Sequence, residues 1–233
     1  MICYVDIEHE RVLQDAEKRP TQLIRRMEVK LRLEEISGQA CLLQNYSRVT
    51  RQRLKEWGIQ ALLISGCGAD WSEYDEADLA EMYRIVRDAD LPILGFCGGH
   101  QLIALAHGVP LGPMRRLEAG EKDIYPGLGP GYHKEWDHTP VRVLKADPIF
   151  EGLGKEAVFL EAHYWEMKEV PPGFELLAST DVCRIQAVRR TGTLVYGTQF
   201  HPEYYYFSEE EETLYNDGRK LLANFFKLAG ILE

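Results

Sequence analysis

The chain has 233 residues, of which 45% are hydrophobic and 27% charged, and its 27 basic and 37 acidic residues give a formal net charge of −10. This composition is typical of a folded globular protein and excludes a disordered chain. The negative charge also argues against a protein that binds nucleic acid or an anionic membrane surface, because both attract positive charge.

The cysteines and the apolar segments indicate the compartment. The five cysteines are widely spaced and form no Cys-x-x-Cys pair, which argues against a disulfide framework and against a zinc ribbon. No segment reaches the roughly 18 consecutive apolar residues of a membrane span, and the apolar run at residues 2–7 contains an aspartate and follows no basic region. We therefore expect a cytoplasmic protein with free thiols that begins with a strand rather than a signal peptide.

Strand and helix patterns alternate through the first hundred residues. Short runs of apolar, β-branched residues predict strands at residues 2–7, 40–44, 61–65 and 92–96. The segments between them show the apolar spacing of helices. Alternation of this kind predicts an α/β fold, with an open, mostly parallel sheet covered by helices on both faces.

Two helices are predicted in this half. The first, at residues 21–37, is followed by Gly38 as a terminating glycine, and the second begins after Ser72 as its N-cap and ends before Pro92. We expect the apolar face of each helix to pack inward and the charged face of the first to be solvated. The apolar positions are Leu23, Ile24, Met27, Leu31 and Ile36 on the first helix and Leu79, Met82, Tyr83 and Val86 on the second.

The second half of the chain has weaker signals. Residues 108–140 are rich in glycine and proline and fit either a β-hairpin or a mobile loop. Strand patterns at 141–144, 157–161, 174–179, 184–189 and 193–199 are spaced like an antiparallel extension of the sheet. The acidic run at 209–212 predicts the first turn of a C-terminal helix that carries Leu214, Leu221, Leu222, Phe225 and Phe226. Because we find no repeat, low-complexity tract or long linker, we expect one domain spanning residues 1–233.

The most informative segment is residues 91–103. An apolar strand ends at Gly95, Cys97 follows, and a helix pattern begins at Gly99. A Gly-x-Cys-x-Gly sequence between a strand and a helix predicts a strained turn that lifts the cysteine above the sheet, where the helix dipole favours the thiolate and the N–H of Gly98 faces a developing oxyanion. An isolated cysteine is more often an inert core residue, but a core cysteine does not need a glycine on each side, so we interpret Cys97 as a nucleophile.

A thiol nucleophile requires a base and a group that orients the base. His201 follows the strand pattern at 193–199, and strand ends are where sites form in open α/β sheets. Pro202 stiffens the turn, and Glu203 is close enough to accept the second ring N–H of His201. A His-Pro-Glu sequence alone is more often a surface turn, but beside the cysteine motif it predicts the base and its orienting carboxylate.

Two further segments are pocket candidates. The glycine loop at residues 65–68 fits either a second oxyanion donor or an ordinary tight turn, and residues 163–166 fit either a pocket wall or a packed loop. We expect no metal and no cofactor, because the chain has no nucleotide-binding glycine loop and several histidines lack metal-ligand spacing. These histidines are His9, His107, His133 and His138.

Together the motifs resemble the class I, triad-type glutamine amidotransferase domains. Residues 95–101, Gly-Phe-Cys-Gly-Gly-His-Gln, look like the family's nucleophile motif, and residues 197–203, Gly-Thr-Gln-Phe-His-Pro-Glu, look like its His-Pro-Glu motif. The resemblance extends over nearly the whole chain, through Ser65 and Gly66 in the oxyanion loop, residues 172–175 before a strand, and a closing helix near 218–230. In the family the loop usually reads Gly-Gly-Pro, where this chain has Cys67 and Gly68, and a larger residue is common at Gly98.

The resemblance implies a flavodoxin-like fold and a glutaminase half-reaction. Cys97 would attack the side-chain amide of glutamine, His201 would protonate the departing ammonia and activate water, and Glu203 would hold His201. The resemblance further implies that amides of Gly66 and Gly98 stabilise the oxyanion, and that Gln101 and the backbone near Tyr164 hold the substrate.

Three functions remain open from the sequence. The first is a glutaminase component that delivers ammonia to a synthase on a separate chain, since we expect no synthase domain in these 233 residues. The second is a stand-alone γ-glutamyl hydrolase acting on a γ-glutamyl conjugate, suggested by the altered loop and by Gly98. The third is a non-catalytic regulatory protein of the same fold, against which the complete set of Cys97, His201 and Glu203 argues.

Overall fold

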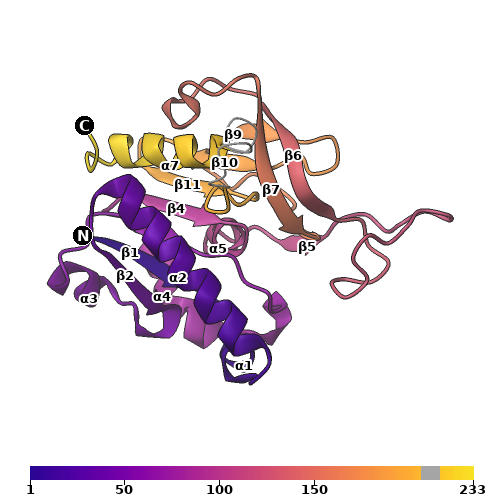
Figure 1. Cartoon of the computed structure of the whole chain (residues 1–233), viewed down its shortest axis with the longest axis horizontal. Coiled ribbons are helices and arrows are strands. Elements are labelled where there is room, and N and C mark those ends of the chain that lie inside the picture. Colours follow the sequence, from indigo (N-terminus) through magenta and orange to yellow (C-terminus); the bar gives the residue numbers. More distant parts are fainter. Residues whose placement is uncertain (206–215) are drawn as a thin grey trace.

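A computed structural model describes residues 1–205 and 216–233 of the chain (Figure 1). Within them, nine strands form one sheet in the order β2-β1-β3-β4-β11-β10-β9-β6-β7. The first five run parallel and are called the parallel half here: β2 (Cys41–Asn45), β1 (Ile2–Asp6), β3 (Leu62–Ile64), β4 (Ile93–Phe96) and β11 (Val195–Thr198). The other four are antiparallel and are called the antiparallel half: β10 (Ala187–Arg190), β9 (Phe174–Ser179), β6 (Glu135–Val143) and β7 (Glu156–His163).

Helices cover both faces of the parallel half, because its side chains alternate between two buried faces. α2 (Lys18–Ser37) and α7 (Asp217–Leu228) pack on one face, against residues such as Tyr4 and Leu94. α3 (Arg51–Glu56), α4 (Glu76–Arg87) and α5 (Gly98–Ala106) pack on the other, against residues such as Val5 and Ile93. The observed architecture confirms the expected open, mostly parallel sheet with an antiparallel extension.

Short elements complete the described chain. β5 (Leu111–Pro113) and β8 (Trp165–Met167) form a separate two-stranded sheet, and α1 (Glu10–Gln14) precedes α2. Three single-turn helices lie at η1 (Tyr46–Arg48), η2 (Trp71–Glu73) and η3 (Pro148–Phe150). The segment from β5 to β6 projects from the body of the molecule in Figure 1 and has a bridge between Arg116 and Tyr132, so residues 108–140 include a short hairpin-like ladder.

The inner face of α2 differs from the expected one. Leu23, Ile24, Met27 and Leu31 are 48%, 61%, 47% and 55% exposed, whereas Ile36 is buried as expected. The buried stripe instead consists of Arg26, Val29, Leu33 and Ile36, which are also spaced at helical intervals. The prediction was wrong because Arg26 finds a buried carboxylate, Asp6, on β1, and this ion pair fixes which face of the helix turns inward.

The predictions for the second helix and for the strand at 193–199 were confirmed only in part. The N-cap of α4 is Asp75, whose side chain accepts the N–H of Ala77, rather than Ser72, which lies in η2. On α4, Leu79, Met82 and Val86 are buried as expected, while Tyr83 is half-buried. The strand predicted at 193–199 is β11, which runs parallel to β4 and belongs to the parallel half rather than to the extension. The acidic run at 209–212 and Leu214 lie outside the described residues.

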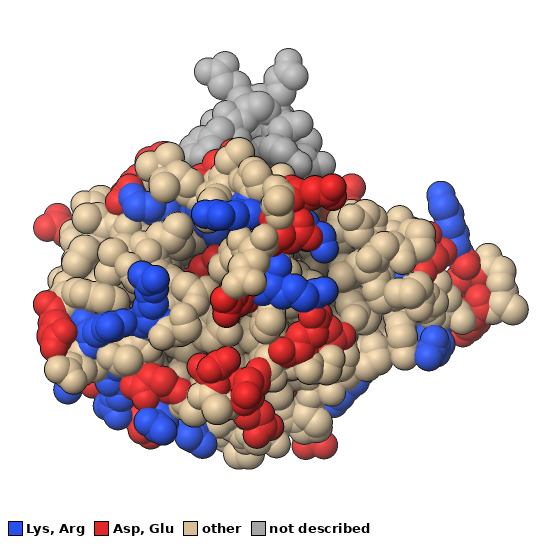
Figure 2. Space-filling model, turned by 90° about the horizontal axis from the view of Figure 1, so that it is seen from below, with Lys and Arg blue, Asp and Glu red and all other residues tan. Residues whose placement is uncertain are grey.

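Surface charge agrees with the expectation from composition. On the face that Figure 2 shows, acidic and basic side chains are interspersed without a continuous basic stripe. None of the described helices is long and apolar enough to cross a membrane.

Candidate active site

Cys97 occupies the turn between β4 and α5. Its backbone has φ 45° and ψ −99°, a conformation that side-chain-bearing residues rarely adopt, and it forms the N-cap of α5. The N–H of Cys97 donates to Thr198 O on β11 (2.7 Å), which fixes the turn against the neighbouring strand. The strained turn and the positive end of the α5 dipole therefore meet at the thiol, as the motif predicts.

The glycines flanking Cys97 are required by close backbone contacts. A Cβ atom at Gly95 would lie 2.5 Å from the carbonyl carbon of Gly99, and a Cβ atom at Gly99 would lie 2.5 Å from Ile64 O on β3. Both distances are too short for any side chain. The glycines therefore let α5 start directly over the sheet.

His201 and Glu203 follow β11 and lie beside Cys97. Nδ1 of His201 is 2.8 Å from Oε1 of Glu203, and the His201 ring and Cys97 both lie against Gly66, close enough for the thiol to act on the charge of the imidazole. The imidazole is 9% exposed and the Glu203 carboxylate is fully buried. The N–H of His201 also donates to Leu160 O on β7 (2.9 Å), so the two halves of the sheet meet at this residue.

The electrostatics of this group favour a charged imidazole. Burial by itself lowers the pKa of His201, but the Glu203 carboxylate and Cys97 more than compensate and raise that pKa well above its usual range. Because Nδ1 faces a carboxylate, it carries a proton, and Nε2 is left to exchange a proton with the thiol. The arrangement can thus hold a thiolate beside an imidazolium.

A chain of amide side chains adjoins the thiol. Nε2 of Gln199 donates to Sγ of Cys97 (3.5 Å), and Oε1 of Gln199 accepts from Nε2 of Gln101 (3.2 Å). Gln101 also donates to Trp165 O (2.9 Å) and accepts from Nε1 of Trp71 (2.7 Å). Gln101 lies at the candidate pocket, as expected, and its polar atoms connect the pocket walls to the thiol.

The loop after β3 lies against the same group. A Cβ atom at Gly66 would be 2.9 Å from Cε1 of His201 and 3.4 Å from Cβ of Cys97, so only a glycine fits. Among the described residues, the backbone amides of Gly66 and Gly98 have no protein acceptor. Both N–H groups are therefore available as donors to a bound oxyanion.

A buried ion pair fixes this loop from below. Arg26 on α2 is 5% exposed, and its Nε donates to Oδ1 of Asp6 (2.9 Å) while an Nη donates to Gly66 O (2.9 Å). The Ser65 hydroxyl donates to the same carbonyl (2.8 Å). These two hydrogen bonds fix the peptide plane between Gly66 and Cys67 and so restrict the backbone of this loop.

Glu8 fixes the other end of the loop. This carboxylate is 1% exposed and accepts the backbone N–H of Gly68 (2.8 Å) and of Ala69 (3.2 Å). Two backbone donors satisfy a buried carboxylate without a cation. Glu8 and Arg26 thus hold the loop at both ends, and neither role was predicted from the sequence.

Cys67 explains why position 98 is a glycine. A Cβ atom at Gly98 would lie 2.8 Å from Sγ and 2.9 Å from the backbone N of Cys67, so both the thiol and the backbone of Cys67 occupy the space above Gly98. Desolvation raises the pKa of Cys67, and the nearby Cys97 and Glu8 act in the same direction. Cys67 is therefore a neutral packing residue beside the Cys97 thiol. The larger residue at position 67 and the smaller residue at position 98, both departures from the family sequence, compensate for each other in volume.

A cavity of about 230 Å³ opens at Cys97. The loop at 67–71, Gln101 and residues 162–165 line it. Residues 127–129 from the segment between β5 and β6 close it, where a Cβ atom at Gly129 would collide with the ring of Tyr164. Tyr164 also donates to Oδ2 of Asp70 (3.3 Å), so it lies in the pocket wall as expected.

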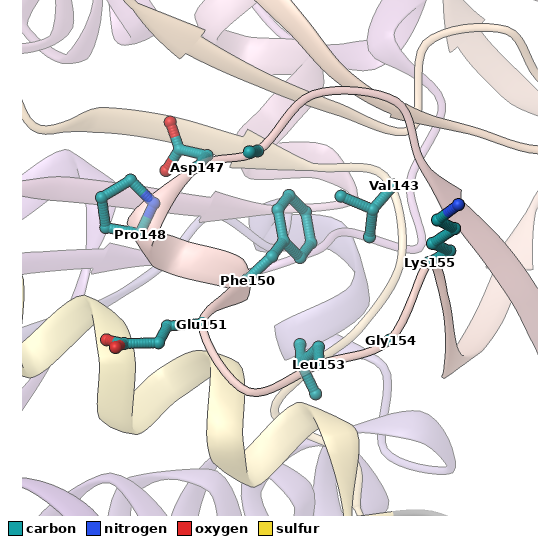
Figure 3. A pocket seen from close by; sticks show the side chains of 9 residues that line it. Val143, Asp147, Pro148, Phe150, Glu151, Leu153, Gly154 and Lys155 are labelled. Atoms are coloured by element: carbon teal, nitrogen blue, oxygen red, sulfur yellow. The ribbon is translucent and has the colours of Figure 1, made fainter.

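A larger cavity, of about 920 Å³, is lined by the chain segment that connects β6 to β7 and is shown in Figure 3. Its lining includes the apolar side chains of Val143, Phe150 and Leu153. Of the two carboxylates that line it, that of Asp147 is already engaged by Arg189 (2.6 Å) and by the Tyr196 hydroxyl (3.1 Å). None of its lining residues belongs to the Cys97 group, so the smaller cavity is the candidate active site.

Known proteins resemble this chain in sequence and fold. The family model "Glutamine amidotransferase class-I" matches residues 12–221. The glutamine-hydrolysing GMP synthase subunit of Methanocaldococcus jannaschii is 38% identical over 63% of this chain and 64% of that protein, just under two thirds of its length. The Methanosarcina barkeri protein of the same name is 39% identical over 66% of this chain and 70% of that protein.

The fold matches as well. A glutamine amidotransferase structure from Thermotoga maritima superposes with a TM-score of 0.65 at 13% identity, covering 98% of this chain and 97% of that one. The sequence match reaches from before α2 into α7 and includes both motifs around the Cys97 pocket. The chain therefore belongs to the class I glutamine amidotransferase family.

Proposed function

We propose that this protein is the glutamine-hydrolysing component of a two-chain amidotransferase, with Cys97 as nucleophile, His201 as acid and base, and Glu203 as the residue that orients His201. The observation that carries the proposal is the buried contact between the Cys97 thiol and a histidine held by a carboxylate 2.8 Å away. If Cys97 only filled space in the core, the strained backbone conformation of this residue would serve no purpose.

The first half of the reaction forms a thioester. Sγ of Cys97 attacks the side-chain carbonyl carbon of glutamine, and the carbonyl oxygen becomes an oxyanion that accepts the N–H groups of Gly66 and Gly98. Each such donor lowers the barrier by about 3 kcal/mol. As the C–N bond breaks, His201 gives its Nε2 proton to the nitrogen, and ammonia leaves.

The second half regenerates the enzyme. His201, now neutral at Nε2, takes a proton from water as the water oxygen attacks the thioester carbon. The same two N–H groups stabilise the second oxyanion. When the C–S bond breaks, glutamate is released and Cys97 returns to the thiolate beside the imidazolium.

The shape of the cavity favours free glutamine over a γ-glutamyl conjugate. Its volume of about 230 Å³ is below the roughly 300–1,000 Å³ typical of pockets for drug-sized ligands. Cys67 fills the space above Gly98, and residues 127–129 also line the cavity. Asp70, in the wall, supplies a carboxylate for the ammonium group of an amino acid.

The names of the curated relatives support a separate synthase as the recipient of ammonia, with GMP as the product of the assembled enzyme. We also propose that residues 1–233 form one domain, supported by a single sheet that uses strands from both ends of the described chain. A cytoplasmic location is supported by five free cysteines.

The test is ammonia release from glutamine by the purified protein, alone and with the synthase component of a GMP synthase. A glutamine-directed electrophile should label Cys97, as read by peptide mass spectrometry, and Cys97→Ser should abolish ammonia release. Cys3→Ala, at a buried cysteine outside the pocket, serves as the control. Ammonia release retained by the Cys97→Ser protein would overturn the proposal.

A further inference from the structure

Behind the pocket wall lies a buried cluster of residues that the proposed reaction does not use, called the Glu-His-Cys cluster here. It consists of Glu135 on β6, Glu161 and His163 on β7, and Cys183 in the connection between β9 and β10. They are 5%, 0%, 3% and 0% exposed. Glu135 and His163 face each other across the β6–β7 ladder, and His163 also lines the pocket.

The charges of this cluster do not balance. Both carboxylates approach the same atom, Nε2 of His163, with Oε2 of Glu135 at 3.1 Å and Oε2 of Glu161 at 3.2 Å. Among the described residues, His163 is the one ion-pair partner of either carboxylate. With both carboxylates ionised, two negative charges face one positive charge even when His163 is protonated, and burial accordingly raises the pKa of Glu161.

The two carboxylates differ in their other partners. Glu135 accepts the Thr180 hydroxyl and Nε2 of Gln186 (2.6 Å). Glu161 has no such donor within the described chain, and Oε1 of Glu161 is buried without a hydrogen bond. A fully buried carboxylate in this state is costly unless a cation completes its surroundings.

The orientation of His163 is the one seen in metal ligands. Its Nδ1 lies 3.0 Å from Trp165 O, and since a carbonyl only accepts, Nδ1 carries a proton. A ligating histidine usually donates its second ring N–H to a backbone carbonyl in this way, which leaves the other nitrogen for the metal. In His163 that other nitrogen, Nε2, points between the two carboxylates.

Distances and donor types agree with a zinc site. Ligand atoms of Glu135, His163 and Cys183 all lie within 4.8 Å of one another. Zinc bonds of about 2.0–2.3 Å in a tetrahedron place ligand atoms about 3.3–3.8 Å apart, so the two Nε2 to Oε2 pairs, at 3.1 and 3.2 Å, must move slightly apart and the sulfur must move closer. A mixed sulfur, nitrogen and carboxylate set favours zinc over calcium or magnesium, which take oxygen ligands.

We propose that Glu135, His163 and Cys183 bind one zinc ion as a structural site, and that Glu161, whose Oε2 lies 3.2 Å from Nε2 of His163, moves in as the fourth ligand. The ion replaces any proton on Nε2 of His163 and the thiol proton of Cys183, so binding releases protons to solvent. It ties β6 and β7 to the connection before β10. It also fixes Trp165, whose carbonyl accepts both Nδ1 of His163 and Nε2 of Gln101, and thereby supports the wall of the active site.

The test measures zinc binding without using catalysis, so its result does not depend on the proposed glutaminase activity. The parent protein is the full chain with Cys97→Ala, which removes the catalytic thiol as a competing ligand. After treatment with a chelator, this protein is titrated with zinc against a chromophoric chelator. We expect one zinc per chain, and with cobalt in place of zinc we expect a thiolate-to-metal charge-transfer band.

Two variants locate the site. Glu161→Gln keeps the size of the side chain and should weaken zinc binding at least about tenfold, while Cys183→Ala should weaken binding and remove the charge-transfer band. Cys3→Ala, at an equally buried cysteine on β1, should change neither. Zinc should raise the melting temperature of the parent but not of Glu161→Gln. Absence of competitive zinc binding by the parent, or equal affinity in parent and Glu161→Gln, would overturn the proposal.

Discussion

The two halves of the sheet contribute to the pocket in different ways. The parallel half supplies the reacting groups from strand ends, with Cys97 after β4, His201 after β11 and Gly66 after β3. The antiparallel half supplies a wall, formed by residues 162–165 and closed by residues 127–129. The proposed catalytic residues thus lie on short turns at the ends of buried strands. The wall that encloses the pocket depends on contacts between segments that are distant in the sequence. Changes in the parallel half should lower kcat, and changes in the antiparallel half should mainly raise KM.

The largest effect is expected at the nucleophile. Cys97→Ala removes the attacking atom and should lower kcat for glutamine hydrolysis by about 10⁶-fold, as loss of the nucleophile of a catalytic triad does in other enzymes. KM should change little, because the cavity keeps its walls. Steady-state ammonia release gives both constants, and a change confined to KM would contradict the division between the two halves.

The second effect concerns the ion pair under the oxyanion loop. Arg26→Met leaves Asp6 buried without its cation and should lower the free energy of unfolding by about 3–5 kcal/mol, measured by urea denaturation. The double variant Asp6→Asn with Arg26→Met removes both charges and should lose less. If the single variant is as stable as the unmodified protein, Arg26 does not hold the loop.

The third effect is on the protonation of His201. Glu203→Gln removes the carboxylate that raises the pKa of His201 against burial, and the pKa should fall by about 1–3 pH units, read by NMR titration of the imidazole. A raised pKa stabilises the fold fully below the unfolded-state value, and this stabilisation disappears as the pH rises through the folded-state value. In the Glu203→Gln protein, this stabilisation should disappear at a lower pH than in the unmodified protein. Asp181→Asn, at an exposed aspartate, should leave the titration unchanged.

The fourth effect tests the wall. Gly129→Ala adds a Cβ atom that collides with the Tyr164 ring and should displace residues 127–129, lowering kcat/KM by about 10- to 100-fold, mostly through KM. Gly120→Ala is the matched control, because Gly120 also has a positive φ but open space around its Cβ position. Equal losses in both variants would mean that backbone strain, rather than the contact with Tyr164, is responsible.

The smallest effect should come from an exposed ion pair in the antiparallel half. Arg142 and Asp181 are 2.6 Å apart, but their side chains are 45% and 85% exposed. Water and salt screen such a pair, so Arg142→Ala should change the free energy of unfolding by at most about 0.5 kcal/mol in the same urea experiment. A loss as large as that of Arg26→Met would show that burial does not govern the strength of ion pairs here.

The reacting residues could be predicted from the sequence because each lies in a local pattern. Cys97 sits between glycines at a strand-to-helix junction, and His201 follows an apolar strand. Both signals depend on neighbours within a few residues, and the structure brings the two together as the topology of a parallel sheet requires.

The supporting residues could not be predicted in the same way. Arg26 has charged neighbours in the sequence, so its face of the helix is predicted to be solvated. Its partner Asp6 lies in another element. Glu135, His163 and Cys183 come from three segments and show no spacing motif. Such groups come together only when distant segments pack against each other, so no pattern among neighbouring residues in the sequence reveals them.

The fit between Cys67 and Gly98 constrains how this sequence can change. A large residue at position 98 would collide with the Cys67 thiol, and a glycine at position 67 alone would leave a void beside the nucleophile. The two positions share one volume, so the order of substitutions matters. A bulkier residue at 98 requires a smaller side chain at 67 and also a shift of the loop backbone, and each such sequence has a differently shaped floor beneath its substrate.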